Sequence, residues 1–231
     1  TNDPALDGKA TIEMLMDYVM PAQDALLIPD GYDIKITTAN GSAYKGEGPY
    51  AVISTENGFA KDPMFENEGA LTFTGIVLNG KNMKVSSEMV RSNAKEIDDS
   101  DDEGTEVKNG LYIEDNASFI NANNTGNGGA VHISKRKAYI SGGSFENNKA
   151  DKGGAIYVSS GGLEITGSNI GVPGKGNHAN EGGAIYYTGG GTVKIEGGSI
   201  AYNQADTGNG GGIYAENGTF EIKGGSIINN T

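Results

Sequence analysis

The C-terminal half of the chain repeats one pattern of short strand-like segments and glycine-rich turns. A pair of glycines leads into an apolar segment. A second segment follows, in which apolar and polar residues alternate, and a third segment comes after a Gly-Gly-Ser turn. Repeats begin at Gly128, Gly153, Gly182 and Gly210, with spacings of 25, 29 and 28 residues. A repeat of this length indicates a stack of similar units, because one unit alone cannot bury its apolar face.

Alternation within each repeat assigns the faces of the predicted strands. In Leu163–Ile165 and Val193–Ile195 the outer residues are apolar and the middle one is charged, so the outer pair is predicted to point inward. We predict an all-β fold, a right-handed, three-sided, single-stranded parallel β-helix of roughly eight coils. The predicted inward columns are Leu71, Leu111, Ala138, Leu163, Val193 and Phe220; Phe73, Ile113, Ile140, Ile165, Ile195 and Ile222; Phe119, Phe145, Ile170, Ile200 and Ile227; and Val131, Ile156, Ile185 and Ile213.

The one long repeat differs from the others in a single turn. Asn148 follows Phe145 by 3 residues, whereas Asn177 follows Ile170 by 7 residues. The additional residues lie around 172–175 and account for the longer spacing (29 − 25 = 4). We therefore expect the insertion to occupy one turn and to leave the strands in register.

Residues 1–231 are predicted to form one β-helix domain cut from a longer protein. Residues 1–80 would form irregular coils or a cap, 81–110 an interrupted coil with an acidic loop, and 111–231 the regular repeats. Thr11–Met20 has apolar residues at both helical and strand spacing. A strand is favoured, because Ile28–Thr37 follows it and has the pattern of a turn and a further strand.

Charge and composition exclude several classes of function. The net charge of −13 argues against nucleic-acid binding, which requires a basic face. The chain has no cysteine and no apolar run near the roughly 18 residues that span a bilayer. We expect a monomer that does not insert into a membrane, located outside the cell, either secreted or at a bacterial cell surface.

An acidic run at residues 96–106 is the one place where the sequence resembles a metal site. Asp99, Asp101 and Glu103 place carboxylates at alternate positions before Gly104, as calcium loops do. Gly110 stands where such a loop would need its last carboxylate, so a solvated loop is favoured over a calcium site. No other cofactor is expected.

Outward residues of the repeats form further columns. His132, Tyr157, Tyr186 and Tyr214 are either a ligand-binding strip or an aromatic column that only shields the sheet, and both interpretations stay open. A shorter aromatic pair, Tyr112 and Tyr139, is predicted on another face.

Charged outward residues also follow one another from coil to coil. Glu164, Lys194 and Glu221 are interpreted as a cross-strand charge ladder rather than as the paired carboxylates of a glycosidase.

The sequence shows little sign of a catalytic site. His132 and His178 have no predicted serine nucleophile or third ligand beside them, and Arg91 and Arg136 have no evident carboxylate partner. The basic residues 135–137 are predicted to form a solvated turn. No enzymatic activity is expected, and a polysaccharide lyase or glycoside hydrolase is the alternative.

Two tetrapeptide motifs resemble those of a known family. Gly-Gly-Ala-Ile occurs at Gly153–Ile156 and Gly182–Ile185, and Phe-x-x-Asn occurs at Phe145–Asn148. These resemble the paired motifs of the chlamydial polymorphic outer-membrane proteins, an autotransporter adhesin family, and similar repeats occur in cell-wall surface proteins of Gram-positive gut bacteria. The resemblance covers Leu111–Thr231 well and Pro29–Gly80 loosely. It implies an adhesin-type module that presents a binding face to a host surface protein or a glycan.

Overall fold

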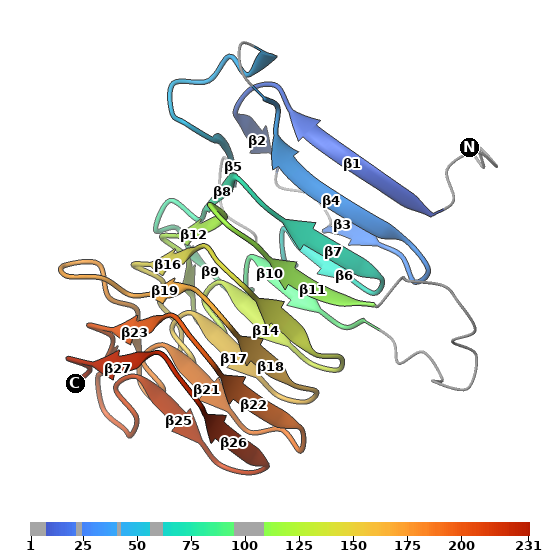
Figure 1. The fold of residues 1–231 in the computed structure, drawn as a ribbon. Coiled ribbons are helices and arrows are strands. Elements are labelled where there is room, and N and C mark those ends of the chain that lie inside the picture. Colours follow the sequence, from blue (N-terminus) through green and yellow to red (C-terminus); the bar gives the residue numbers. More distant parts are fainter. Residues whose placement is uncertain (1–7, 22–24, 41–42, 56–61, 95–108) are drawn as a thin grey trace.

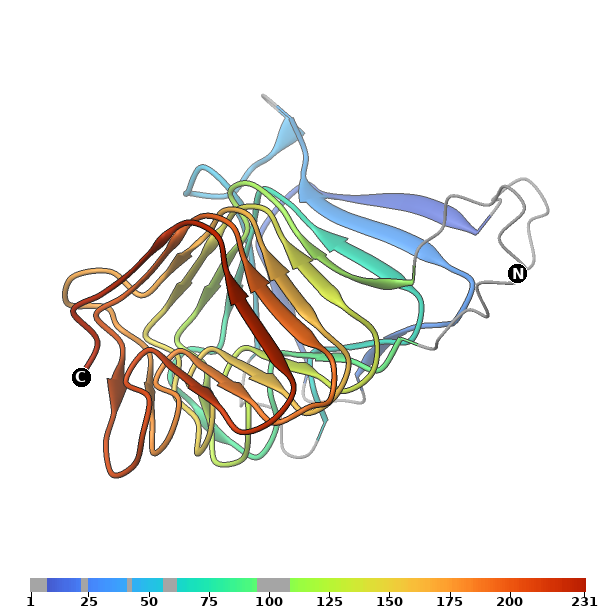
Figure 2. The same cartoon turned by 60° about the horizontal axis from the view of Figure 1, so that its bottom comes forward.

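The described residues form stacked coils of short parallel strands. The computed structural model describes residues 8–21, 25–40, 43–55, 62–94 and 109–231. Strands from successive coils pair in parallel and build three long sheets, which run from one end of the stack to the other (Figure 1). The view in Figure 2 shows the three sides enclosing a common interior. The predicted three-sided parallel β-helix is confirmed.

Three sheets, which we name A, B and C, make up the sides of this stack. Sheet A contains β1 (Lys9–Met14), β4 (Asp33–Thr38), β7 (Ala70–Phe73), β11 (Gly110–Ile113), β15 (Ala138–Ile140), β18 (Leu163–Ile165), β22 (Thr192–Ile195) and β26 (Thr219–Ile222). Sheet B contains β2 (Tyr18–Met20), β5 (Ala51–Thr55), β8 (Ile76–Asn79), β12 (Ser118–Ile120), β16 (Ser144–Glu146), β19 (Asn169–Ile170), β23 (Ser199–Ala201) and β27 (Ser226–Ile228). Sheet C contains β3 (Leu26–Ile28), β6 (Phe65–Asn67), β10 (Val90–Ser92), β14 (Val131–Ile133), β17 (Ile156–Val158), β21 (Ile185–Tyr187) and β25 (Ile213–Ala215).

Two pairs of short parallel strands form a corner between sheets B and C. They are β9 (Lys84–Val85) with β13 (Asn123–Asn124), and β20 (His178–Ala179) with β24 (Gln204–Ala205). Isolated bridges from Lys149 to Asn123 and to His178 connect the two pairs across the intervening coil. Each regular coil therefore passes through sheet A, sheet B, this corner and sheet C in turn.

The interior is built from the predicted apolar columns. Ile195 pairs with Ile165 on one side and Ile222 on the other, and only 2% of its surface is exposed. All four predicted columns are in register from coil to coil. Neighbouring coils bury apolar faces that an isolated coil would expose, which is the main source of stability in solenoids.

Glycine and asparagine occupy the turns because the backbone there is left-handed. Gly153 has a φ of 64°, and a Cβ atom at this position would lie 2.1 Å from the carbonyl oxygen of Ile156. Asn147 has a φ of 54° in the turn that follows β16. Asparagine is one of the few non-glycine residues that adopt this conformation readily.

The insertion in the long repeat is confined to its turn, as predicted. Asn177 occupies the position of Asn148 and Asn203 in the neighbouring coils despite the additional residues before it. A turn closes the insertion, in which the Lys175 N–H donates to the carbonyl oxygen of Val172 at 2.9 Å. The strands on both sides keep their register.

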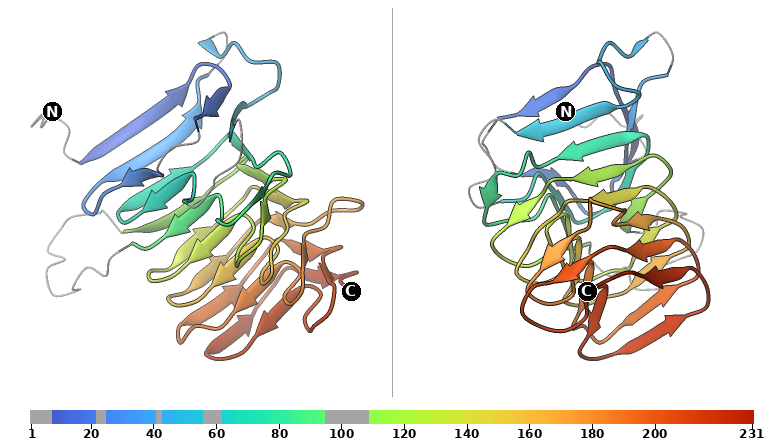
Figure 3. Two further views of the ribbon diagram at one scale, coloured as in Figure 1. Left: turned by 180° about the vertical axis from the view of Figure 1, so that it is seen from behind. Right: turned by 90° about the vertical axis from the view of Figure 1, so that its left-hand side faces the viewer.

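The N-terminal part continues the same stack. Figure 3 shows β1 and β4 extending sheet A at the end opposite the C-terminus. Residues 9–14 and 18–20 are strands, so the strand predicted within Thr11–Met20 is confirmed. In the segment predicted as an interrupted coil, β10 lies in register between β6 and β14. None of the described segments forms a helix of the length and apolarity that crossing a bilayer requires.

Candidate ligand-binding faces

The predicted aromatic column lies on the outward face of sheet C. His132, Tyr157, Tyr186 and Tyr214 are paired in register on β14, β17, β21 and β25. Their ring centroids are 4.9, 5.6 and 4.8 Å apart from one coil to the next. We name these four residues the aromatic column, which is continuous over four coils.

The centre of the aromatic column is enclosed by charged side chains. Tyr186 is only 1% exposed, and the Lys152 Nζ atom lies 4.5 Å from its ring centroid and 2.9 Å from its hydroxyl oxygen. Lys152 also pairs with Glu181 at 3.3 Å, and Glu216 accepts a hydrogen bond from Thr188 at 2.7 Å. Half-buried Tyr157 and Tyr214 therefore lie on either side of a covered ring, within a polar border.

Ionisation states at this column follow from burial and from these contacts. Burial raises the pKa of the Tyr157 and Tyr186 hydroxyls, so both remain protonated at neutral pH. The hydrogen bond to Tyr186 raises the pKa of Lys152. Thr188 and Tyr186, which donate hydrogen bonds to the Glu216 carboxylate, lower its pKa. The column thus carries neutral hydroxyls between fixed positive and negative charges.

The structure places a serine beside His132 and a carboxylate beside Arg91, neither of which was predicted, while His178 Nδ1 lies 3.9 Å from Oδ1 of Asp206. His132 Nε2 lies 2.8 Å from the Ser159 hydroxyl, and His132 Nδ1 lies 3.9 Å from Oε1 of Glu88. Arg91, predicted to have no carboxylate partner, places Nε 2.5 Å from the same oxygen of Glu88. Glu88 and Arg91 lie three residues apart on one coil, whereas the contacts of His132 with Glu88 and Ser159 join three successive coils and follow from no local sequence motif.

This arrangement places a serine hydroxyl beside a histidine whose other ring nitrogen faces a carboxylate. The buried Glu88 carboxylate is held by Arg91 and by Ser87, whose hydroxyl donates to Oε2 at 3.2 Å. The Ser159 hydroxyl oxygen also lies within hydrogen-bond distance of the carbonyl oxygen of Ile133, at 3.3 Å. Nucleophile activation requires the histidine to accept the serine proton while a third group orients the ring.

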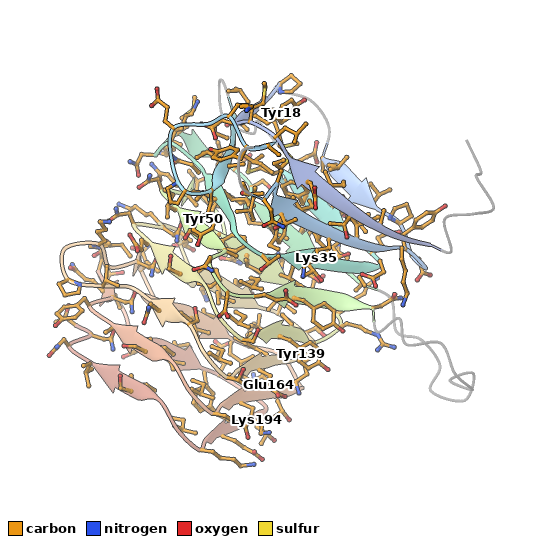
Figure 4. The ribbon with its side chains drawn as sticks, turned by 45° about the horizontal axis from the view of Figure 1, so that its top comes forward. Tyr18, Lys35, Tyr50, Tyr139, Glu164 and Lys194 are labelled. Atoms are coloured by element: carbon orange, nitrogen blue, oxygen red, sulfur yellow. The ribbon has the colours of Figure 1, made fainter. Side chains whose placement is uncertain are left out.

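The outward column of sheet A is in register, but its ion pairs differ from the predicted ladder. Figure 4 shows Tyr139, Glu164 and Lys194 following one another along this face. Glu164 pairs with Lys137, which lowers the pKa of its carboxyl, while Lys194 pairs with Glu196 at 2.7 Å. Glu221 pairs with Lys223 at 2.9 Å. Each charge is therefore neutralised mainly by a turn or near-neighbour residue rather than by the adjacent rung.

The same contact corrects the prediction for the basic turn at residues 135–137. Lys135 is exposed as expected, whereas Lys137 is half-buried and lies 5.1 Å from the centroid of the Tyr139 ring. Tyr139 itself stacks on Tyr112, with centroids 5.2 Å apart and an interplanar angle of 8°. The predicted second aromatic pair is therefore present on sheet A.

The candidate calcium residues cannot be placed in the same way. Asp99, Asp101 and Glu103 lie outside the described residues. Among the residues that the structure does describe, no group of three or more histidine and carboxylate side chains could hold a metal ion.

One residue that sequence reasoning missed is Lys152, which encloses the aromatic column. It occupies a turn and reaches Tyr186 34 positions later in the chain. The repeat could have indicated the ion pair of Lys152 with Glu181. These residues occupy equivalent positions in successive turns and carry opposite charges.

Together, the coil geometry and the outward columns define the class of the protein as a parallel β-helix repeat protein. Residues 142–159 match the family model of the Chlamydia polymorphic membrane protein repeat. The matched segment contains β16, Asn148, the glycine turn and β17, and thus both recurring motifs. No curated protein and no solved structure matches the chain. The repeat match supports a bacterial surface protein.

Proposed function

We propose that the chain is an adhesin-type module of a bacterial cell-surface protein and that it binds a protein ligand through the aromatic column of sheet C. The observation that carries this proposal is the continuous row of ring contacts through His132, Tyr157, Tyr186 and Tyr214 within a polar border. Tyrosine is enriched at the centres of protein interfaces, where polar residues surround the contact. The repeat match at residues 142–159 agrees with a position at the cell surface.

Binding rather than catalysis is the role supported by the contacts around His132. Burial lowers the pKa of His132, so the ring is neutral at neutral pH. However, Glu88 Oε1 already accepts a close hydrogen bond from Arg91, and 3.9 Å separates it from His132 Nδ1. These contacts favour a network that joins three coils over a nucleophile, and they also weigh against the alternative of a carbohydrate-active enzyme.

A host-protein array, followed by a binding titration of the strongest protein hit, tests this proposal. Tyr214→Ala removes a half-buried ring from the column and should weaken binding by about tenfold or more. Tyr202→Ala, which truncates a tyrosine that is 40% exposed outside the column, is the matched control and should leave binding unchanged. Equal losses in the two variants would contradict a role of the column.

The enzymatic alternative has its own test. We expect a fluorophosphonate probe, which labels activated serines, to leave Ser159 unmodified. Labelling that disappears in Ser159→Ala would instead support a hydrolytic function.

A further inference from the structure

The outward face of sheet A has a hollow of about 370 Å³ near the N-terminal end of the stack. Its lining includes Lys9, Thr11, Asp33, Lys35, Thr72 and Glu114. These residues come from β1, β4, β7 and the turn after β11, so the hollow spans four coils. Its volume falls within the roughly 300–1,000 Å³ that is typical of small-ligand sites.

The hollow exists because short side chains interrupt columns of long ones. Thr72 lies in register between Lys35 on β4 and Tyr112 on β11. Thr11 lies in register with Lys35 on the other side, so short side chains flank Lys35 in this column. The regular coils beyond Tyr112 fill this column with Tyr139, Glu164 and Lys194, so the hollow is confined to the N-terminal coils (Figure 4).

Charges around the hollow are balanced and accessible. Lys9 and Lys35 contribute two positive charges, and Asp33 and Glu114 contribute two negative charges. Lys35 Nζ lies 3.0 Å from Glu114 Oε2, and each of these side chains is 41% exposed. Ammonium groups donate hydrogen bonds and carboxylates accept them, so a ligand that both donates and accepts, such as a sugar hydroxyl, satisfies both.

An aromatic ring borders the Thr72 position on one side. Tyr112 stacks on Tyr139, and its strand position pairs in register with Thr72. Burial, the neighbouring Tyr139 and the Asp33 carboxylate raise the pKa of the Tyr112 hydroxyl to about 12. The Tyr112 hydroxyl, next to the hollow along sheet A, therefore stays protonated at physiological pH.

We propose that this hollow on sheet A binds a neutral saccharide. Balanced charge in the lining gives no preference for an ionic ligand, and the net charge of −13 on the chain disfavours acidic glycans. Paired donors and acceptors in an open hollow of this size suit a ligand with several hydroxyl groups. This site is separate from the aromatic column on sheet C and does not depend on the function proposed for that column.

An array of neutral oligosaccharides tests the proposal. The array holds glucose, mannose, galactose and N-acetylglucosamine oligomers, together with sialylated and sulfated oligosaccharides for comparison. We expect binding to at least one neutral oligomer, which is then titrated by calorimetry. No binding to neutral oligomers, or binding only to the acidic ones, would overturn the proposal.

Two variants test whether the sugar binds in the hollow. Thr72→Tyr fills the hollow and extends the ladder of Tyr112 and Tyr139, so the coil should still fold while affinity falls by about tenfold or more. Glu114→Gln is nearly isosteric and removes an acceptor charge, so it should also weaken binding. Lys194→Ala, on the same column outside the hollow, should bind as the unmodified chain does. Unreduced affinity in a folded Thr72→Tyr or in Glu114→Gln would show that the sugar binds elsewhere, whereas Tyr214→Ala tests only the column on sheet C.

Discussion

Asn148 and Asn177 are joined by two hydrogen bonds to a single oxygen. Oδ1 of Asn177 accepts from Nδ2 of Asn148 at 2.9 Å and from the backbone N–H of Asn148 at 3.0 Å. Asn177 and Asn203 repeat this contact one coil further along. Each side-chain amide also donates to a backbone carbonyl of the preceding coil, as Asn177 does to Phe145 at 3.0 Å. This asparagine ladder satisfies the buried polar groups of the turn that leaves sheet B.

Removal of one rung should destabilise the stack. Asn177→Ala leaves the buried N–H of Asn148 without its acceptor, and one such group costs about 1–3 kcal/mol. We expect a total loss of more than about 2 kcal/mol in the free energy of unfolding, measured in urea melts. Asn180→Ala, which removes an exposed amide bonded to Asp151, is the control and should cost less than about 1 kcal/mol.

Substitutions of inward and of outward residues on neighbouring strands should lower the free energy of unfolding by different amounts. Ile195→Ala removes a side chain buried between Ile165 and Ile222 and should cost about 2–5 kcal/mol through lost burial and a cavity. Glu164→Ala breaks an ion pair near the surface and should cost less than about 1 kcal/mol. Similar losses would contradict the orientation of these strands.

Stability should fall in mild acid because His132 is held neutral. Burial lowers the pKa of its imidazole, so the folded state binds a proton less readily than the unfolded chain does. Stability is therefore complete above the unfolded pKa of about 6.5 and decreases as the pH falls from there toward the folded value. The neighbouring charges oppose each other, since Glu88 favours protonation and Arg91 disfavours it.

The comparison of His132→Phe with the unmodified chain checks this effect. Phenylalanine keeps a ring against Tyr157 but cannot bind a proton. Urea melts at about pH 7.5 and about pH 5.5 should show a smaller difference for the variant. An equal pH dependence would mean that other groups cause the acid sensitivity.

The acidic run requires a separate experiment, because its residues lie outside those described. From the sequence we expect a solvated loop, so millimolar calcium should not raise the melting temperature more than magnesium does. A calcium-specific rise, with a dissociation constant of about 10⁻⁴–10⁻³ M in calorimetric titration, would instead assign ligand roles to Asp99, Asp101 and Glu103.

The sequence predicted the interior better than the surface. The columns through Ile165 and Ile195 follow from alternation and a repeat of nearly constant length, both of which are visible in the printed chain. The Asn-ladder position was also evident as a recurring residue, although its hydrogen bonds were not. The position of Lys35 beside Thr72 was harder to predict, because the repeat is weak in the N-terminal coils.

Contacts between surface side chains depend on the conformations of the turns, which the length of the sequence repeat does not specify. Lys152 covers Tyr186 and Ser159 reaches His132 only because the turns of adjacent coils bring them together. Glu88 and Arg91 are close in sequence. Their contact with His132 was harder to predict, because His132 lies on the next coil, which follows residues 95–108 in the chain. Such contacts require the relative height and direction of each turn, and these emerge only when the coils are stacked.

The long turn at residues 172–175 has a consequence for protein engineering. Pro173, Gly174 and Lys175 are exposed, and the asparagine rung that follows them keeps its place between its neighbours. The turn between β19 and the corner strand β20 can therefore accept extra residues without a change in the spacing of the strands. Peptide epitopes or affinity tags inserted between Pro173 and Gly174 would be displayed on a rigid support, and equivalent turns one coil apart would present several copies at a fixed interval.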